Sequence, residues 1–136
     1  MNIQAIIHHL KTGDDVDAQM EEFERLDRGA TRDDLPILLS ALQTEDAGPW
    51  LRELISQPVL RIGGVSVLPD VLRAFDRNFR EGHDNDTLSG LLADFAEQNR
   101  VEVKKALDAI ELEHDGILPE TIDWLLEYCE ADDNGA

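Results

Sequence analysis

The chain has 136 residues, the size of one domain, which is long enough to bury a hydrophobic core. Hydrophobic residues make up 42% of it and aromatic residues 5%, which argues against general disorder and favours helices packed through aliphatic side chains over a β-sandwich. The formal net charge of −18 argues against contact with nucleic-acid phosphates or anionic lipid, and the single cysteine excludes an intrachain disulfide.

The N-terminal segment does not have the basic stretch and long apolar run of a signal peptide. No window approaches the roughly 18 consecutive apolar residues of a membrane-spanning helix. We therefore expect a cytoplasmic protein that contacts neither membrane nor nucleic acid.

Apolar residues recur at helical spacing along the chain, beginning with Ile3, Ile6, Ile7 and Leu10 at positions i, i+3, i+4 and i+7. Turn residues separate these stripes. The pattern predicts helices at about 2–11, 16–28, 34–43, 48–62, 67–81, 86–100, 101–114 and 119–130. Pro58 lies inside the fourth of these and should kink or divide it, because proline removes a backbone hydrogen bond and crowds the preceding turn.

The stretch from Asp33 to Gly64 forms a unit of two short helices, and the following segment begins in the same way. Leu35-Pro36 and Leu68-Pro69 lie one repeat apart, within the range of two-helix solenoid units. The predicted fold class is all-α, an α-solenoid of about four stacked helical hairpins. It forms a single domain over residues 1–130, followed by a flexible acidic tail at 131–136.

These repeats resemble the bacterial HEAT-like repeat family. DLPILLSALQ is similar to the first helix of such a repeat, and WLRELISQPVLRIGG is similar to the second. Arg52 matches a frequent arginine early in the second helix, while residues 65–99 keep the Leu-Pro start without that arginine. The resemblance covers about half of the chain. It implies a protein-binding scaffold, because HEAT-like arrays generally bind other proteins.

Small, acidic, single-domain HEAT-like proteins are also similar to immunity proteins of bacterial polymorphic toxin systems, which bind and block a cognate toxin domain. This second resemblance rests on size, acidity and architecture. It implies that the partner is a basic toxin domain, and that the chain needs no cofactor. The alternative is a scaffold or adaptor subunit of a bacterial protein complex, and the oligomeric state stays open.

The negative charge is concentrated in the C-terminal part. Residues 83–136 hold fifteen acidic and three basic side chains, a net charge of −12, whereas residues 35–82 hold six and five, a net charge of −1. One interpretation is a docking surface for a basic partner, and the other is a solvated outer face. The candidate docking residues are Asp108, Glu111, Glu113, Glu120, Asp123, Glu127 and Glu130.

Two groups of residues are candidates for direct contact with a partner. Trp124 and Tyr128 are four residues apart and share one flank of the last predicted helix, where they could anchor an interface. Alternatively, Trp124 closes the end of the core. Trp50 and Arg52 are candidates for the inner surface of the array, although the position of Trp50 beside Leu51 and Leu54 favours its burial.

No catalytic motif emerges, and the metal-binding patterns are incomplete. His83, Asp84 and Asp86 offer ligands for a hard cation, but the simpler interpretation is that an aspartate caps the next helix. Glu111 and His114 have the Glu-x-x-His spacing of a di-metal site without a second such pair. The single cysteine, Cys129, lies on an apolar stripe. We expect no enzymatic activity and no metal.

Overall fold

The computed structural model describes residues 2–44, 47–113 and 116–130. Over these residues the fold is all-α, as predicted, with no strand. The α-helices are α1 (Ile3–Thr12), α2 (Val16–Gly29), α3 (Leu35–Gln43), α4 (Gly48–Gly63), α5 (Leu68–Arg80), α6 (Asp86–Gln98), α7 (Arg100–Glu113) and α8 (Pro119–Glu130). Two short 3-10 turns, η1 (Arg32–Asp34) and η2 (Gly64–Val67), precede α3 and α5. The predicted tail at 131–136 lies outside the described residues.

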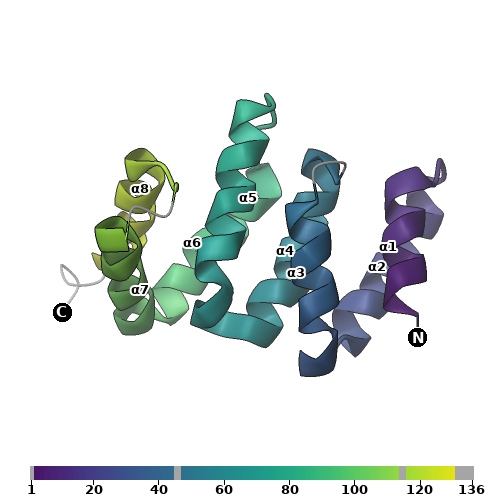
Figure 1. Ribbon diagram of the computed structural model, residues 1–136, viewed down its shortest axis with the longest axis horizontal. Helices are drawn as coiled ribbons and strands as arrows, with labels where there is room; N and C mark the ends of the chain where they lie inside the picture. The colour runs from purple at the N-terminus through teal and green to yellow at the C-terminus, as the bar shows by residue number, and fades with distance from the viewer. Residues whose placement is uncertain (1, 45–46, 114–115, 131–136) are drawn as a thin grey trace.

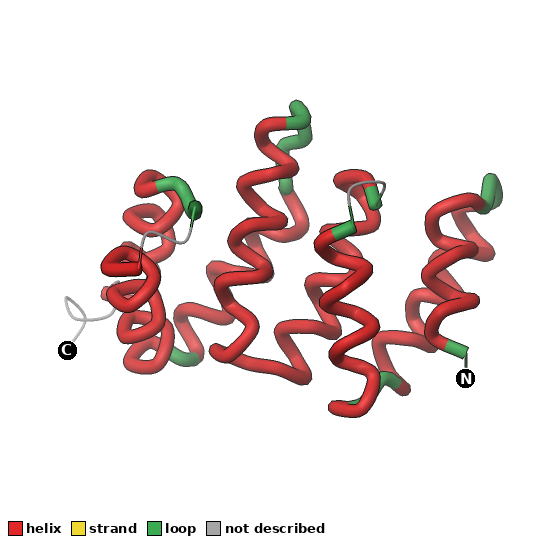
Figure 2. The backbone as a smooth tube through the Cα atoms, in the orientation of Figure 1, coloured by secondary structure: helices red, strands yellow, loops and turns green. Residues whose placement is uncertain are grey.

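The first six helices are arranged in two rows. α1 packs on α2 and α3 packs on α4, so consecutive helices form pairs. α3 also contacts α1 and α5, while α4 also contacts α2 and α6. One row is therefore α1, α3 and α5, the other is α2, α4 and α6, and the chain runs from one end of the molecule to the other (Figures 1 and 2).

The last pair is arranged differently. α8 follows α6 in the second row, and α7 packs on α8, α6 and η2. α5 meets α8 through the stacked rings of Phe75 and Trp124. The helices α5, α6 and α8 thus surround one region at the C-terminal end of the molecule (Figure 1).

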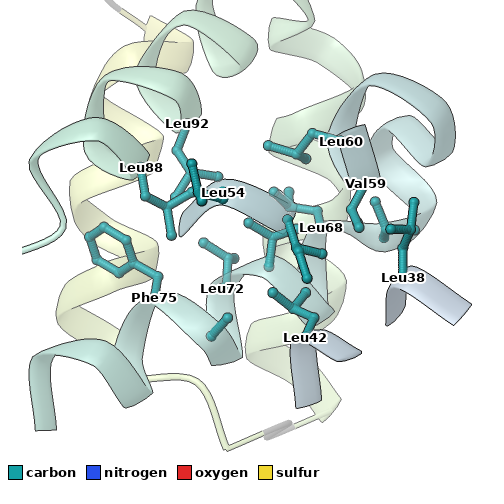
Figure 3. Packing of buried hydrophobic residues seen from close by; sticks show 14 of the residues in the cluster. Leu38, Leu42, Leu54, Val59, Leu60, Leu68, Leu72, Phe75, Leu88 and Leu92 are labelled. Atoms are coloured by element: carbon teal, nitrogen blue, oxygen red, sulfur yellow. The ribbon is translucent and has the colours of Figure 1, made fainter. Parts of the chain in front are cut away.

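One contiguous hydrophobic core runs through the described residues. In its centre, Leu54 of α4, Leu72 and Phe75 of α5, and Leu88 and Leu92 of α6 point toward one another (Figure 3). Burying a side chain of this size stabilises the fold by about 1.5–3 kcal/mol. The core therefore holds the two rows together and supports the region between α5 and α6.

The two Leu-Pro pairs begin structurally equivalent helices. Leu35-Pro36 begins α3 directly after η1, and Leu68-Pro69 begins α5 directly after η2. Proline is tolerated in the first turn because the N–H that it lacks would have no partner inside the helix. The repeat seen in the sequence thus marks neighbouring helices of one row.

Of the two effects expected of Pro58, a kink or a division of the fourth helix, the division does not occur. α4 continues through this residue to Gly63, and Pro58 is buried together with Val59 and Leu60. Burial of these side chains offsets the hydrogen bond that proline removes. The helix ends where glycines were expected to end it, and Gly64 has a φ of 60°, which favours glycine.

Two leucines of α7 test whether this outer helix belongs to the cooperative core. Leu107 is fully buried, whereas Leu112 is 82% exposed. Leu107→Ala should lower the free energy of unfolding by about 2–5 kcal/mol, because it leaves a cavity. The matched change Leu112→Ala should alter it by less than about 0.5 kcal/mol. Urea denaturation measures both, and equal losses would contradict the packing of α7.

Candidate binding groove

Four aromatic side chains form a continuous series between α5 and α8. Phe75 contacts Phe79 edge to face, with ring centroids 4.8 Å apart. It also stacks on Trp124, with centroids 5.3 Å apart and an interplanar angle of 12°. Trp124 in turn contacts Tyr128 edge to face at 5.5 Å. Offset and edge-to-face pairs of this kind are the favourable arrangements of aromatic rings.

These rings form one side of an open, mainly apolar groove of about 460 Å³. The residues that line it come from α5, α6, and α8 with the segment before it: Phe75, Phe79, Ser89, Gly90, Ala93, Leu118, Glu120, Thr121, Trp124 and Tyr128. The wall contributed by α6 consists of small residues. Phe79 is 48% exposed and Leu118 is 43% exposed, so large apolar side chains meet solvent here.

A buried carboxylate sets the position of α8. Asp76 follows Phe75 on α5 and is 1% exposed. Its Oδ2 atom accepts a hydrogen bond from the Leu118 N–H at 2.8 Å, and its Oδ1 atom accepts one from the Thr121 hydroxyl at 2.5 Å. A negative charge at a helix N-terminus is stabilising. This contact holds the start of α8 against α5 and so brings Trp124 onto Phe75.

A second carboxylate, which is distant from α6 in the sequence, caps that helix. Glu53 of α4 accepts a hydrogen bond from the Leu88 N–H at 2.8 Å, in the first turn of α6, and its other oxygen contacts His83 Nε2. The expectation that Asp84 or Asp86 caps this helix is therefore wrong. Asp84 accepts only a long hydrogen bond, 3.4 Å, from the Asp86 N–H. The cap comes from the preceding helical pair and fixes α6 to α4.

Arg52 is an internal link rather than a residue available to a partner. Its side chain is completely buried, and Nη1 donates to Asn78 Oδ1 at 3.0 Å and to Glu81 Oε1 at 2.9 Å. Asn78 continues the network by donating to Asn85 Oδ1 at 2.7 Å. The hydrogen bond from Arg52, aided by Arg77, holds the pKa of Glu81 below its ordinary value of 4.5. The prediction that Arg52 contacts a partner is corrected accordingly.

The structure brings three of the predicted partner-binding residues together. Glu120, Trp124 and Tyr128 all line the groove. Glu127 lies three residues after Trp124 and is exposed on the same helix. Because the sequence placed Trp124 and Tyr128 on one flank of their helix, this part of the site could be predicted without the structure.

The remaining predicted residues lie elsewhere. Glu111 and Asp123 line a smaller hollow of about 210 Å³ formed by α7 and α8 with the segment between them. Asp108 is exposed on α7. Glu113 and Glu130 are also exposed. Trp50 is 39% exposed in the first turn of α4, and it is not part of the groove lining.

Sequence reasoning missed half of the groove. The apolar spacing of Leu68, Val71, Leu72, Phe75 and Phe79 predicts a single core stripe on their helix, which does not reveal the exposure of Phe79. Gly90 carried a usable signal, because a glycine inside a helical pattern costs about 1 kcal/mol relative to alanine. Such a glycine calls for a structural or functional explanation.

The described residues give no support to a metal or thiolate site. They contain no group of three or more His, Cys, Asp or Glu side chains that could hold a metal ion. His114, the partner of Glu111 in the Glu-x-x-His pair, lies outside them. Burial raises the pKa of the Cys129 thiol, and the neighbouring Glu130 charge raises it further. No described helix has the length and apolar character needed to cross a membrane.

Glu81 should make stability depend on pH. Its folded-state pKa lies below the ordinary value of 4.5, so its stabilising contribution is complete at neutral pH and is lost as the pH falls through the folded-state value. Glu81→Gln should therefore destabilise the protein at about pH 7, and the difference from wild type should shrink toward about pH 3. Urea denaturation at several pH values measures this. The exposed Glu21→Gln is the control, and a constant difference for Glu81→Gln would contradict the Arg52 contact.

Asp76 should be required to position α8. Asp76→Ala leaves the Leu118 N–H and the Thr121 hydroxyl without their acceptor and should cost about 1–3 kcal/mol of unfolding free energy. The emission of Trp124, recorded in a Trp50→Phe background, should also shift toward that of a solvent-exposed indole. The control Asp123→Ala removes an exposed aspartate from α8. It should change neither the unfolding free energy nor the Trp124 emission. An unchanged Trp124 emission in Asp76→Ala would show that this contact does not position the helix.

Comparison with known proteins assigns the chain to no family. No protein-family model matches the sequence, no curated protein matches it, and no solved structure matches it. The resemblances to HEAT-like repeats and to immunity proteins stay predictions.

Proposed function

We propose that this chain is a non-enzymatic protein-binding module, an α-solenoid of about four HEAT-like helical hairpins, whose partner docks at the C-terminal end. The two rows formed by α1 to α6 and the equivalent starts of α3 and α5 support the solenoid part of the proposal. The different packing of the last pair, in which α7 packs on α8, α6 and η2, supports a specialised end, because it is there that the apolar groove opens.

The exposed aromatic groove is the observation that carries the proposal. Large apolar side chains that remain uncovered in a highly charged chain mark an interaction site. Tryptophan and tyrosine are frequent anchors of protein interfaces, since they bury much area at little cost in conformational entropy. Trp124 and Tyr128 provide such anchors beside the acidic Glu120.

The kind of partner follows from the charge. Residues 83–136 carry a net charge of −12, and the predicted docking carboxylates that lie on α7 and α8 are exposed. A surface of this sign accelerates encounter with a basic protein and repels acidic ones. Within the class of binding modules, this favours an immunity protein that covers a basic bacterial toxin domain in the cytoplasm.

The alternative is a scaffold or adaptor subunit, and a second charged surface favours it. Arg73, Arg77 and Arg80 line a hollow of about 260 Å³ on α5, formed with residues of α3. They outnumber its one acidic lining residue, Asp70, which pairs with Arg73. Opposite charges on two faces would suit two different partners. An adaptor binds two proteins at once, whereas an immunity protein needs one, so the composition of the complex purified from the native host separates the two functions.

Neutralising the C-terminal acidic surface should weaken partner binding. The test variant carries Asp108→Asn, Glu111→Gln, Glu120→Gln, Asp123→Asn and Glu127→Gln. Its association rate constant with the partner captured from the native host should fall by about tenfold or more, because electrostatic steering is reduced. Its binding should also become less sensitive to salt. Surface plasmon resonance at low and high ionic strength measures both effects.

A matched variant with the same change in net charge controls for the overall field. It carries Asp14→Asn, Asp17→Asn, Glu21→Gln, Glu24→Gln and Asp33→Asn, all of them exposed positions in the N-terminal part. This variant should bind nearly as fast as wild type. Equal effects of the two variants, or wild-type binding that does not change with salt, would contradict docking at the C-terminal end.

A further inference from the structure

We infer that the groove receives one amphipathic helix of the partner, with a stripe of large apolar side chains facing the groove and lysine or arginine on its flanks. This inference rests on the proposed function and specifies the occupant of the same site. It follows from the shape of the groove, from the dimensions of the helices beside it and from the charges around it.

The α6 wall leaves room for a partner to approach closely. Ser89, Gly90 and Ala93 line this wall, and a Cβ atom built on Gly90 would meet no atom within 4 Å. Trp124 and Tyr128 of α8 line the same groove. A groove that combines small residues of one helix with large aromatic residues of another suits an inserted side chain, as in the contacts between packed helices.

The size of the groove fits several side chains of one helix. An apolar cavity of about 150 Å³ holds one benzene ring. The groove volume of about 460 Å³ therefore has room for two or three large apolar side chains. α6 has 13 residues and α8 has 12. At about 1.5 Å per residue they span about 20 Å, which matches three to four turns of a partner helix.

Acidic residues flank the apolar surface on both walls. On α6, Asp86 and Glu97 lie four residues before Gly90 and four after Ala93, so they share the face that lines the groove, and both are exposed. On α8, Glu120 and Glu127 stand four residues before and three residues after Trp124. A helix with basic flanks complements these positions. A second copy of this chain, with its net charge of −18, would be repelled.

Two large apolar side chains of the groove lining stay uncovered in the free chain. Phe79 and Leu118 remain 48% and 43% exposed. They come from α5 and from the segment before α8, so a ligand must extend across both to cover them. An amphipathic helix does this with successive residues of its apolar stripe.

The test is a selection from a display library of helical peptides of about 14 residues, a length that covers the groove at 1.5 Å per residue. The full chain is the target, and the Gly90→Leu variant is used for counter-selection. A Cβ atom at position 90 meets no atom within 4 Å, so a leucine there can extend into the groove that Gly90 lines. Enriched peptides should carry apolar residues at i, i+3 or i+4, and i+7, with lysine or arginine on the flanks. Two results would overturn the inference. One is enrichment of peptides with acidic flanks, and the other is that every enriched peptide also binds the Gly90→Leu variant.

The affinity of an enriched peptide is then measured through Trp124 emission in the Trp50→Phe variant, where it is the single tryptophan. Gly90→Leu should weaken binding by about tenfold or more, because it occupies the space of an apolar side chain. Gly90→Ala is the matched control, since it favours the helix and leaves most of the groove open. It should stay within about threefold of wild type, given the small volume that one methyl group takes. Equal binding to all three would place the peptide elsewhere.

Two further measurements separate the possible failures. If 1-anilinonaphthalene-8-sulfonate binds the groove of the folded chain and no peptide does, the occupant is a small apolar ligand and the inference is wrong. If the partner captured from the host binds Gly90→Leu as tightly as wild type but loses affinity for the C-terminal charge variant, the occupant is wrong while the proposed function stands. If the partner binds both Gly90→Leu and the C-terminal charge variant as tightly as wild type, the helical occupant and the proposed docking at the C-terminal end are both wrong.

Discussion

The contact between Asp76 and the start of α8 is the interaction on which the groove depends. A buried carboxylate is costly unless its oxygens accept hydrogen bonds, and here the Leu118 N–H and the Thr121 hydroxyl supply them. Because Asp76 follows Phe75, the same contact brings Trp124 onto Phe75. A single buried charge thus joins α8 to a helix more than forty residues earlier in the chain and determines where apolar surface stays exposed.

Similar buried links connect α4 to the two helices that follow it. Arg52 ties α4 to the end of α5, and Glu53 ties α4 to the start of α6 through the Leu88 N–H. Each link satisfies a polar group that would otherwise be costly to bury, and each fixes one helix relative to the next. Arg52, Glu53 and Asp76 therefore serve the fold. By contrast, the candidate docking carboxylates of α7 and α8 are exposed and available to a partner.

The sequence was a good guide to the helices and a partial guide to the groove. Apolar periodicity placed the helices within a few residues, and the spacing of Trp124 and Tyr128 revealed one wall. The role of Arg52 could not be predicted, because its partners Asn78 and Glu81 lie in a later helix and charge alone indicates a surface residue. Phe75 and Phe79 were assigned to the core, since periodicity shows which face of a helix is apolar but not whether a neighbour covers all of it.

The most direct test of the account is amide hydrogen exchange of the full chain with and without a saturating helical peptide selected on it. Exchange reports local opening of each helix, so it locates the bound surface without any substitution. The account predicts slower exchange in the second half of α5, in α6 and in α8, with α1 to α3 unchanged. Protection centred on α1 to α3, with α6 and α8 unchanged, would contradict it.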